Sequence, residues 1–424
     1  MQPLLRRSRQ RVGITGLAAA AVVSLWAGAA APPAAANVLP AANPGSVQGG
    51  TAESIAVAAA AKNIMDHSGP GVSIAIVKPD PAHPGQSITT SYHYGRADKA
   101  NAVPVGPQTQ FEIASETKTF TAALLAKRIS DGQSQLSDLA QDYAHGVTLP
   151  TQSGAAITLG DLVTHRSGLT DDPPNLDKPC VGRVTCNPKP LYDRDFLWHG
   201  LETPGALYSS PGSAWLYSDF GFGTLGTLMA DAFAPGQAEP AFGPVVAQEL
   251  TGPLGMTSTE LETDTPNLAQ PYKDGLATDF WDNTAALAGG GGLISTASDM
   301  AKWAAATLGY GDSPLVPVLQ SMLNPIPGPT NPKQPDMTMG MAWQLYPASG
   351  QTPAYAFKNG GATGSTSATY LVPSKGWAVT VLNNGANMDF VSTATKQLMQ
   401  VLAPTIPTRV LGSTGSLSFG SLGS

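Results

Sequence analysis

Residues 111–120 read FEIASETKTF and place a serine, Ser115, three residues before a lysine, Lys118. The apolar run TFTAALLAKRISDG that continues from it predicts a helix over residues 119–132. Positions i and i+3 of a helix lie on one face, so a lysine held near neutrality there could accept the proton of the serine hydroxyl. The same serine could simply cap the helix by bonding a free N–H group. The pair alone leaves both interpretations open.

The composition is that of an exported globular protein. Of the 424 residues, 42% are hydrophobic and 12% are charged, and the formal net charge is −7. Residues 1–36 contain four arginines, no acid and an apolar run ending in APPAAA, which is typical of a secretory signal peptide cleaved after Ala36. A retained membrane anchor is the alternative, but the small residues favour cleavage, so we expect no stable anchor and a periplasmic or extracellular protein. The acidic charge without a basic stripe argues against nucleic acid as a partner.

The chain has two cysteines, Cys180 and Cys186, flanked by Pro179 and Pro188. In an oxidising compartment, two cysteines this close in sequence predict a disulfide that closes a small loop. A metal-binding pair is the alternative, but no histidine lies nearby and no zinc-ligand spacing occurs. We therefore expect no metal and no cofactor.

Strand patterns at both ends of the chain predict one sheet built from the N-terminal and C-terminal parts. The predicted strands are residues 71–79, 87–98, 338–346, 367–373 and 377–384, and the predicted flanking helices are residues 52–67, 119–132 and 390–403. The Pro/Gly-rich middle has helical pieces and few strand signals. It would form a mainly helical region beside the sheet, with a pocket where the two regions meet.

These patterns give the following domain prediction. A flexible lead-in covers residues 37–50, and a disordered Gly/Ser tail covers residues 411–424. One domain covers residues 51–410, with an α/β part at about 51–134 and 300–405 and a helical part at about 135–299.

Two further segments could complete a site for acyl hydrolysis, which needs a proton relay and donors for the oxyanion. The segment PGSAWLYSDFGFGTLG carries Tyr217, whose phenolate two nearby ammonium groups would stabilise; a half-buried loop tyrosine is the alternative. The segment FKNGGATGSTSATYLVP carries Lys358 and glycines that would let substrate approach the backbone. The Gly361 N–H could then pair with the Ser115 N–H as an oxyanion hole, unless the glycines only form a hairpin.

Taken in order, these motifs resemble the Ser-x-x-Lys, Tyr-x-Asn and Lys/His-Thr-Gly motifs of serine β-lactamases and DD-peptidases, above all the class C β-lactamase and DD-carboxypeptidase branch. The segments ITLGDLVTHRSGL, GPLGMTSTEL and GGGGLISTASDMAKW look like that family too, and the resemblance covers roughly residues 52–403. It implies an α/β (α+β) fold in which helices flank an antiparallel sheet and a mainly α-helical domain is inserted. It also implies that Ser115 is the acylated nucleophile and that Lys118 and Tyr217 share the proton transfers.

The resemblance further assigns substrate binding to Asp219, Lys358, Asn359, Gly360 and Gly361, with Lys358 attracting a substrate carboxylate. It makes His165 a structural loop histidine and not a base. Two motif positions depart from the family, because Asp219 stands where Asn is usual and Asn359 where Thr is usual. An ionised Asp cannot donate a hydrogen bond to a substrate amide, and it would favour a charged Lys118.

Three functions follow from this site. The first is a hydrolase of D-alanyl cell-wall peptides, with slow turnover of β-lactams. The second is an esterase on the same scaffold, which the missing amide donor at position 219 favours. The third is a non-catalytic module that binds penicillin or muropeptides, against which the complete Ser115, Lys118, Tyr217 and Lys358 set argues. A metallohydrolase lacks a ligand set, and an esterase with a nucleophile elbow would need G-x-S-x-G, which is absent.

Overall fold

The computed structural model describes residues 37–38, 51–183, 186–236, 242–261 and 263–405. The predicted signal peptide, residues 39–50 of the predicted lead-in and the predicted tail at 411–424 lie outside the described residues. Two residues of the lead-in, Asn37–Val38, form the short strand β1. In the described part of the chain, no helix is long and apolar enough to span a membrane.

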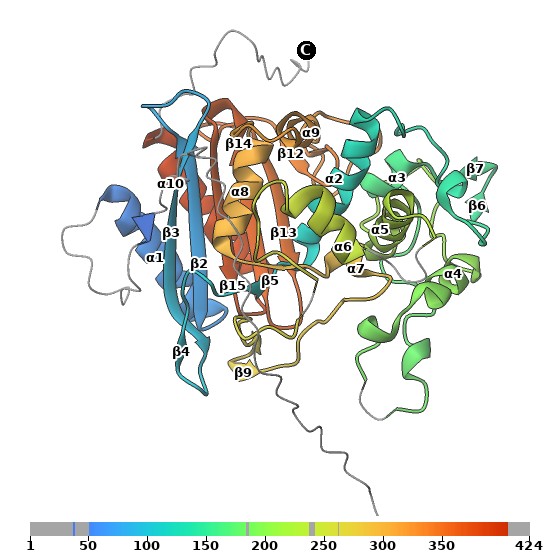
Figure 1. Ribbon diagram of the computed structural model, residues 1–424, viewed down its shortest axis with the longest axis horizontal. Helices are drawn as coiled ribbons and strands as arrows, with labels where there is room; N and C mark the ends of the chain where they lie inside the picture. Colours follow the sequence, from blue (N-terminus) through green and yellow to red (C-terminus); the bar gives the residue numbers. More distant parts are fainter. Residues whose placement is uncertain (1–36, 39–50, 184–185, 237–241, 262, 406–424) are drawn as a thin grey trace, which may run out of the picture. The chain divides into compact units, whose positions relative to one another are not determined.

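A nine-stranded sheet forms the centre of the described structure, and it joins the two ends of the chain (Figure 1). Its order is β1-β3-β2-β15-β14-β13-β12-β11, with β4 pairing β3 from outside this path. All pairs are antiparallel except β1 with β3. The strands are β1 (Asn37–Val38), β2 (Gly71–Pro79), β3 (Ser87–Asp98), β4 (Val103–Pro104), β11 (Thr338–Met339), β12 (Gln344–Tyr346), β13 (Tyr355–Gly361), β14 (Thr366–Val372) and β15 (Trp377–Asn383).

Alternating side chains on the long strands build two cores, one on each face of the sheet. On β2, for example, Val72, Ile74 and Ile76 belong to one core, and Ala75 and Val77 to the other. The first core packs against α1 (Ala52–His67) and α10 (Met388–Leu402). On the opposite face, α8 (Ala297–Thr307) packs against β2 and β15 (Figure 1).

The second core continues from the sheet into the helical middle of the chain. It includes α2 (Thr117–Ser130), which contacts α5, α7 and α9. The remaining helices are α3 (Leu159–Val163), α4 (Arg194–Glu202), α5 (Asp219–Phe233), α6 (Phe242–Val246), α7 (Ala288–Gly291) and α9 (Leu315–Ser321), with a π-helical turn at Ala247–Thr251. Two-residue pairs complete this region: β5 (Phe111–Glu112) with β10 (Ile294–Ser295), β6 (Thr151–Gln152) with β7 (Ala155–Ala156), and β8 (Tyr272–Lys273) with β9 (Leu276–Ala277).

The prediction of an antiparallel sheet from both chain ends, flanked by helices, is confirmed. The predicted strands at 71–79 and 87–98 and the helix at 52–67 have the predicted bounds. The single strand predicted over residues 338–346 is wrong, because the chain turns there and forms β11 and β12. Ala342 sits in this turn with φ of 63°, a conformation that no residue of a regular strand adopts.

Candidate active site

Ser115 lies in a 3₁₀ turn, η1 (Ala114–Glu116), between β5 and α2. Pairing of β5 with β10 fixes the chain just before the serine. Ala114 has φ of 44°, in the left-handed region that residues with a side chain seldom adopt and that clusters at functional sites. Within residues 111–120, Ser115 alone is not fully buried. The fold thus presents one accessible hydroxyl on an otherwise buried segment.

Lys118, on the first turn of α2, is completely buried and points at three oxygen atoms. Its Nζ lies 2.9 Å from Ser115 Oγ and 2.5 Å from Asp219 Oδ1, and it also donates to the Gly290 carbonyl. Burial acts to lower the pKa of Lys118, but Asp219 and, more weakly, Tyr217 together outweigh it, and the pKa is raised. Lys118 is therefore an ammonium in the resting site.

Tyr217 approaches the nucleophile from the other side, and its hydroxyl donates to Ser115 Oγ at 2.7 Å. The nitrogen atoms of Lys118 and Lys358 lie 5.0 Å and 5.5 Å from the centre of its ring. Burial raises the pKa of Tyr217 to about 12, although the charge of Lys118 acts to lower it. Lys118 thus stabilises the phenolate as expected, but burial outweighs this effect in the resting site, and the phenol keeps its proton.

His165 supports Tyr217 and does not contact the nucleophile. Its ring stacks on the Tyr217 ring with centroids 4.3 Å apart, and its Nδ1 accepts a hydrogen bond from the Ser218 N–H at 3.1 Å. Burial, helped by the charges of Lys118 and Lys358, holds the pKa of His165 well below its usual value, so the ring is neutral. The prediction of a hydrogen-bonded loop histidine is confirmed, and the stacking on Tyr217 is a role that the sequence did not indicate.

Asp219 is the first residue of α5, whose N-cap is Ser218. Burial acts to raise the pKa of Asp219, but Lys118, and more weakly Lys189 and Lys358, hold it below the usual value. The Asp219 N–H donates to Asp171 Oδ1 at 3.2 Å. The carboxylate is therefore ionised and lies next to Lys118, and it can only accept hydrogen bonds.

Lys358 projects from β13 toward the same site and is 1% exposed. Its Nζ donates to the Asn359 carbonyl at 3.1 Å. No carboxylate of the described residues lies within ion-pair distance of this nitrogen. Burial, together with the charge of Lys118, lowers the pKa of Lys358 to about 7. The site therefore contains a second buried amine whose charge is not fixed by a partner.

Asn359 follows Lys358 on β13, and strand alternation turns its side chain to the opposite face of the sheet. There its Nδ2 donates to Ser392 Oγ of α10 at 3.1 Å. The Asn359 amide, which stands where the family usually has a threonine hydroxyl, is thus hydrogen-bonded to α10.

Gly360 and Gly361 bring β13 close to the nucleophile. A Cβ atom on Gly360 would lie 2.1 Å from the Ile113 carbonyl oxygen and 2.9 Å from the Ser115 nitrogen. A Cβ atom on Gly361 would lie 2.8 Å from Met388 Sδ. Only glycine at position 360 allows this approach of the strand to the Ser115 backbone. The glycines form a hairpin, β13–β14, and they also permit the close approach, so both interpretations of the motif apply.

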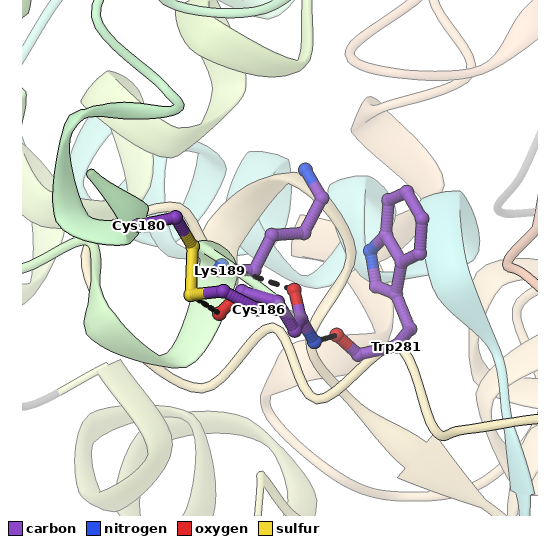
Figure 2. The surroundings of a disulfide bond; sticks show 5 residues. Cys180, Cys186, Lys189 and Trp281 are labelled. Atoms are coloured by element: carbon purple, nitrogen blue, oxygen red, sulfur yellow. Dashed lines mark hydrogen bonds between the residues drawn. A yellow bond between two sulfur atoms is a disulfide. The ribbon is translucent and has the colours of Figure 1, made fainter. Parts of the chain in front are cut away.

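Cys180 and Cys186 form the predicted disulfide, with their Cα atoms 5.7 Å apart (Figure 2). The chain then continues to Asn187, whose Nδ2 donates to the Trp281 carbonyl at 2.8 Å. Lys189 Nζ lies 4.5 Å from the centre of the Trp281 ring. The disulfide loop thus ends against the segment around Trp281. The described residues contain no cluster of three His, Cys, Asp or Glu that could hold a metal ion.

The structure adds two groups to the site that the sequence did not indicate. One is the Gly290 carbonyl, which binds Lys118 from α7. The Gly-rich run at 289–292 was the available signal: a Cβ on Gly289 would lie 2.7 Å from the Cα of Gly226, so α7 can lie against α5 only with glycine there. The other is Glu116, a fully buried carboxylate next to the nucleophile.

Comparison with known proteins agrees with this geometry. The family described as Beta-lactamase matches residues 57–402, which is most of the chain. The chain belongs to the β-lactamase family. Its site, an accessible serine bonded to a lysine and a tyrosine, is that of a serine hydrolase.

Two relatives and one solved structure illustrate the match. The D-alanyl-D-alanine-carboxypeptidase/endopeptidase AmpH of Escherichia coli K12 is 29% identical over 66% of this chain and 72% of its own length. The unguisins hydrolase ungD′ of Aspergillus campestris is 27% identical over 77% of this chain and 60% of its own length. A β-lactamase/D-alanine carboxypeptidase from Yersinia pestis, complexed with citrate, superposes with a TM-score of 0.68 at 23% identity, covering 83% of this chain and 98% of the other.

Proposed function

We propose that this hydrolase acts on D-alanyl peptides of the cell wall through an acyl-enzyme on Ser115, as a carboxypeptidase or endopeptidase, with slow turnover of β-lactams. The observation that carries the proposal is the position of Ser115 Oγ, 2.9 Å from Lys118 Nζ and 2.7 Å from the Tyr217 hydroxyl. Similarity to a protein named as a D-alanyl-D-alanine carboxypeptidase/endopeptidase supports the substrate class.

In acylation, Ser115 Oγ bonds to the substrate carbonyl carbon and the bond to the leaving nitrogen breaks. The serine proton passes into the group formed by Lys118, Asp219 and Tyr217. Lys118 can take it if the ammonium first gives a proton to Asp219, which lies 2.5 Å away. A protonated Tyr217 can donate its proton to the leaving nitrogen. The three side chains have then gained one proton from Ser115 and lost one to the leaving group, so their net charge is the same as at the start. Water repeats the sequence on the acyl-enzyme and releases the acid.

The oxyanion of the tetrahedral intermediate would be bound by the Ser115 and Gly361 N–H groups. The close approach of Gly360 to the Ser115 nitrogen supports this pairing. Lys358 would attract the carboxylate of a C-terminal D-amino acid, since it is a buried amine without an ion-pair partner among the described residues.

An esterase on the same scaffold is the second candidate, and one observation favours it. Asp219 Oδ1 is bonded to Lys118 and has no proton to donate, so the site lacks the side-chain amide that would bind an amide substrate at this position. An ester needs less from such a donor. A non-catalytic penicillin-binding or muropeptide-binding module is disfavoured, because binding alone would not require the Ser115–Lys118–Tyr217 contacts.

We further propose that the protein is exported to the periplasm or the extracellular space after cleavage of residues 1–36. The arginine-rich start followed by an apolar run and small residues supports this. The disulfide between Cys180 and Cys186 also fits an oxidising compartment.

The experiment is a rate comparison on the chain from residue 37 onward. Release of D-alanine from an N-acyl-D-Ala-D-Ala peptide, opening of a chromogenic cephalosporin and cleavage of p-nitrophenyl esters are measured with the wild type and Ser115→Ala. The proposal expects Ser115-dependent release of D-alanine at a rate well above that of cephalosporin opening. Ester cleavage without D-alanine release would establish the esterase instead, and a slowly released penicillin adduct with no turnover of any substrate would establish the binding module.

A further inference from the structure

Glu116, the residue after the nucleophile, is a carboxylic acid with no access to solvent. Its Oε2 accepts a hydrogen bond from Thr369 Oγ1 at 2.7 Å, and its Oε1 has no hydrogen-bond partner among the residues that the structure describes. Burying a carboxyl group with an unpartnered oxygen is costly, and a residue that served only for packing would not need one. Glu116 plays no part in the proton transfers around Ser115 Oγ described above.

The position of Glu116 connects it to Lys358. Thr369, on β14, is the direct cross-strand partner of Lys358 on β13, so the hydroxyl that binds Glu116 lies beside the lysine on the sheet. Thr369 Oγ1 also lies 2.9 Å from Thr380 Oγ1 on β15. Glu116 thus reaches a buried row of polar groups on the sheet face that carries Lys358.

The charged groups that act on Lys358 come from three elements, α2, α5 and η1. Lys118 of α2 acts against its charge, whereas Asp219 of α5 and Glu116 of η1 favour it. Tyr217 is protonated and therefore uncharged in the resting site. The neighbouring His165 ring is neutral as well, because burial lowers its pKa. Asp219 acts more strongly on Lys358 than Glu116 does, but Asp219 is already paired with Lys118. Glu116 is the other carboxylate that favours the charge of Lys358.

Burial raises the pKa of Glu116 to about 7, and burial lowers the pKa of Lys358 to about 7. An acid and a base of similar pKa share about one proton near neutral pH. When that proton is on the amine, the site presents a cation; when it is on Glu116, the site presents a neutral amine. A substrate carboxylate favours the first state, because an opposite charge stabilises the ammonium.

We propose that Glu116 is a positioning residue that keeps Lys358 cationic for a substrate carboxylate, and so sets the preference of this site for substrates that end in one. This inference rests on the proposed function, since it takes Ser115 as nucleophile and Lys358 as carboxylate anchor. It extends the proposed function in two ways: Glu116 is the group that keeps Lys358 charged, and a free carboxylate is the substrate feature that Lys358 selects.

The test uses two thioesters of one N-acyl-D-alanine. The leaving thiol of the first is thioglycolate, with a free carboxylate, and that of the second is its uncharged methyl ester. Glu116→Gln removes the charge and keeps an oxygen that can accept from Thr369. Loss of one unit in the pKa of Lys358 corresponds to about tenfold in its charged fraction above that pKa. We expect kcat/KM for the carboxylate thioester to fall up to about tenfold above pH 7, through KM, with the methyl ester unchanged.

The pH dependence gives an independent readout. In Glu116→Gln, the preference for the carboxylate thioester should be lost at a lower pH than in the wild type. Thr369→Val removes the hydrogen bond that favours the Glu116 anion, so it should shift the preference in the same direction. This second variant carries the test if Glu116→Gln does not fold.

The matched control is Glu112→Gln. Glu112 is also a buried acid of this segment, but its carboxylate accepts from the Trp281 N–H and Ser365 Oγ, away from Lys358. This variant should keep the wild-type preference. An unchanged preference in Glu116→Gln, or an equal loss on both thioesters, overturns the inference. A wild type that hydrolyses neither thioester through Ser115 contradicts the proposed function, which is a separate outcome.

Discussion

Two lysines reach the site from different elements, Lys118 from α2 and Lys358 from β13, and both are buried. Their exposed fractions are 0% and 1%. Lys118 has a carboxylate partner 2.5 Å away, and its pKa is raised. Lys358 has no such partner among the described residues, and its pKa is lowered to about 7. The difference shows that the partner, and not burial, decides whether a buried amine is charged at neutral pH.

The partner of Lys118 is also one of the two motif residues at which this chain departs from its family. Asp219 gives Lys118 a fixed charge and leaves Lys358 as the amine that titrates near neutral pH. We therefore assign proton transfer to Lys118 with its neighbours, and substrate selection to Lys358. Variants of each residue should separate these two roles.

Lys118→Met should lose activity on every substrate, because it removes a group bonded to Ser115 Oγ and leaves Asp219 without its ion pair. We expect kcat/KM to fall on the order of 10²–10⁴-fold for esters and peptides alike. The control is Lys127→Met on the same helix, which removes a lysine paired with Asp131 at the surface. A loss below tenfold would mean that Lys118 takes no part in the proton transfers.

Lys358→Met should be selective where Lys118→Met is general. A hydrogen bond to a charged group contributes about 1.5–3 kcal/mol, so substrates with a free carboxylate should lose roughly 10- to 100-fold in kcat/KM. Uncharged esters should change little. The measurement is the ratio of the two losses on a matched substrate pair. Equal losses would show that Lys358 serves the chemistry and not the carboxylate.

The pH profile should separate the two lysines in the wild type. Because the pKa of Lys358 is lowered to about 7, its charge is present below that pH and is lost as the pH rises through it. The preference for a carboxylate substrate over its ester should then decline above pH 7, by up to about tenfold per pH unit. The decline should be absent in Lys358→Met. A preference that stays constant from pH 6 to 9 would contradict the assignment.

Asp219→Asn should shift the site toward amide substrates. The asparagine supplies an N–H₂ donor, and one hydrogen bond contributes about 0.5–1.5 kcal/mol, or roughly threefold to tenfold. We expect kcat/KM to rise on β-lactams and D-alanyl amides more than on simple esters. The pKa of Lys118 should fall without the neighbouring charge, so the acidic limb of the pH–rate profile should move to lower pH.

The control for this variant is Asp171→Asn, which changes the carboxylate that accepts from the Asp219 N–H and not the one bonded to Lys118. It should leave the ratio of amide to ester rates unchanged. If Asp219→Asn instead loses activity on all substrates alike, the proton transfer from Lys118 to Asp219 contributes more to catalysis than the added amide donor and the lower pKa of Lys118 do.

Loss of the disulfide should have the smallest effect. It closes a short loop, for which chain entropy predicts a stabilisation of about 2 kcal/mol. The double variant Cys180→Ser/Cys186→Ser should unfold at a temperature a few degrees lower and keep most of its activity on esters. Global unfolding on reduction, followed by circular dichroism, would show that the loop supports the whole fold.

The sheet could be predicted from the sequence because its long strands alternate between two apolar cores, as Ile74 and Ala75 do. The split of residues 338–346 into two strands could not, because it depends on a positive φ at Ala342 that leaves no local pattern. The contact between Ser115 and Lys118 could be predicted from their spacing of three residues on one helical turn. Tyr217 required the family resemblance, since it lies 102 positions away.

The charge states were the part that sequence reasoning could not supply. Tyr217 is protonated because burial raises its pKa more than the charge of Lys118 lowers it. The size of the burial effect depends on the packing around the ring. Likewise, the link from Glu116 to Lys358 runs through Thr369, which lies 253 positions from Glu116. Such contacts between distant segments determine the site's electrostatics.

The most direct test of the account is the identity of the acylated residue. The wild type and Ser115→Ala are incubated with a penicillin and, separately, with a phosphonate, and the labelled peptide is located by mass spectrometry. The account expects one adduct, on Ser115, and a loss of hydrolysis on the order of 10⁴-fold or more in Ser115→Ala. Ser213→Ala, which changes an exposed serine, should label and hydrolyse as the wild type does. An adduct on another serine, or full hydrolysis by Ser115→Ala, would contradict it.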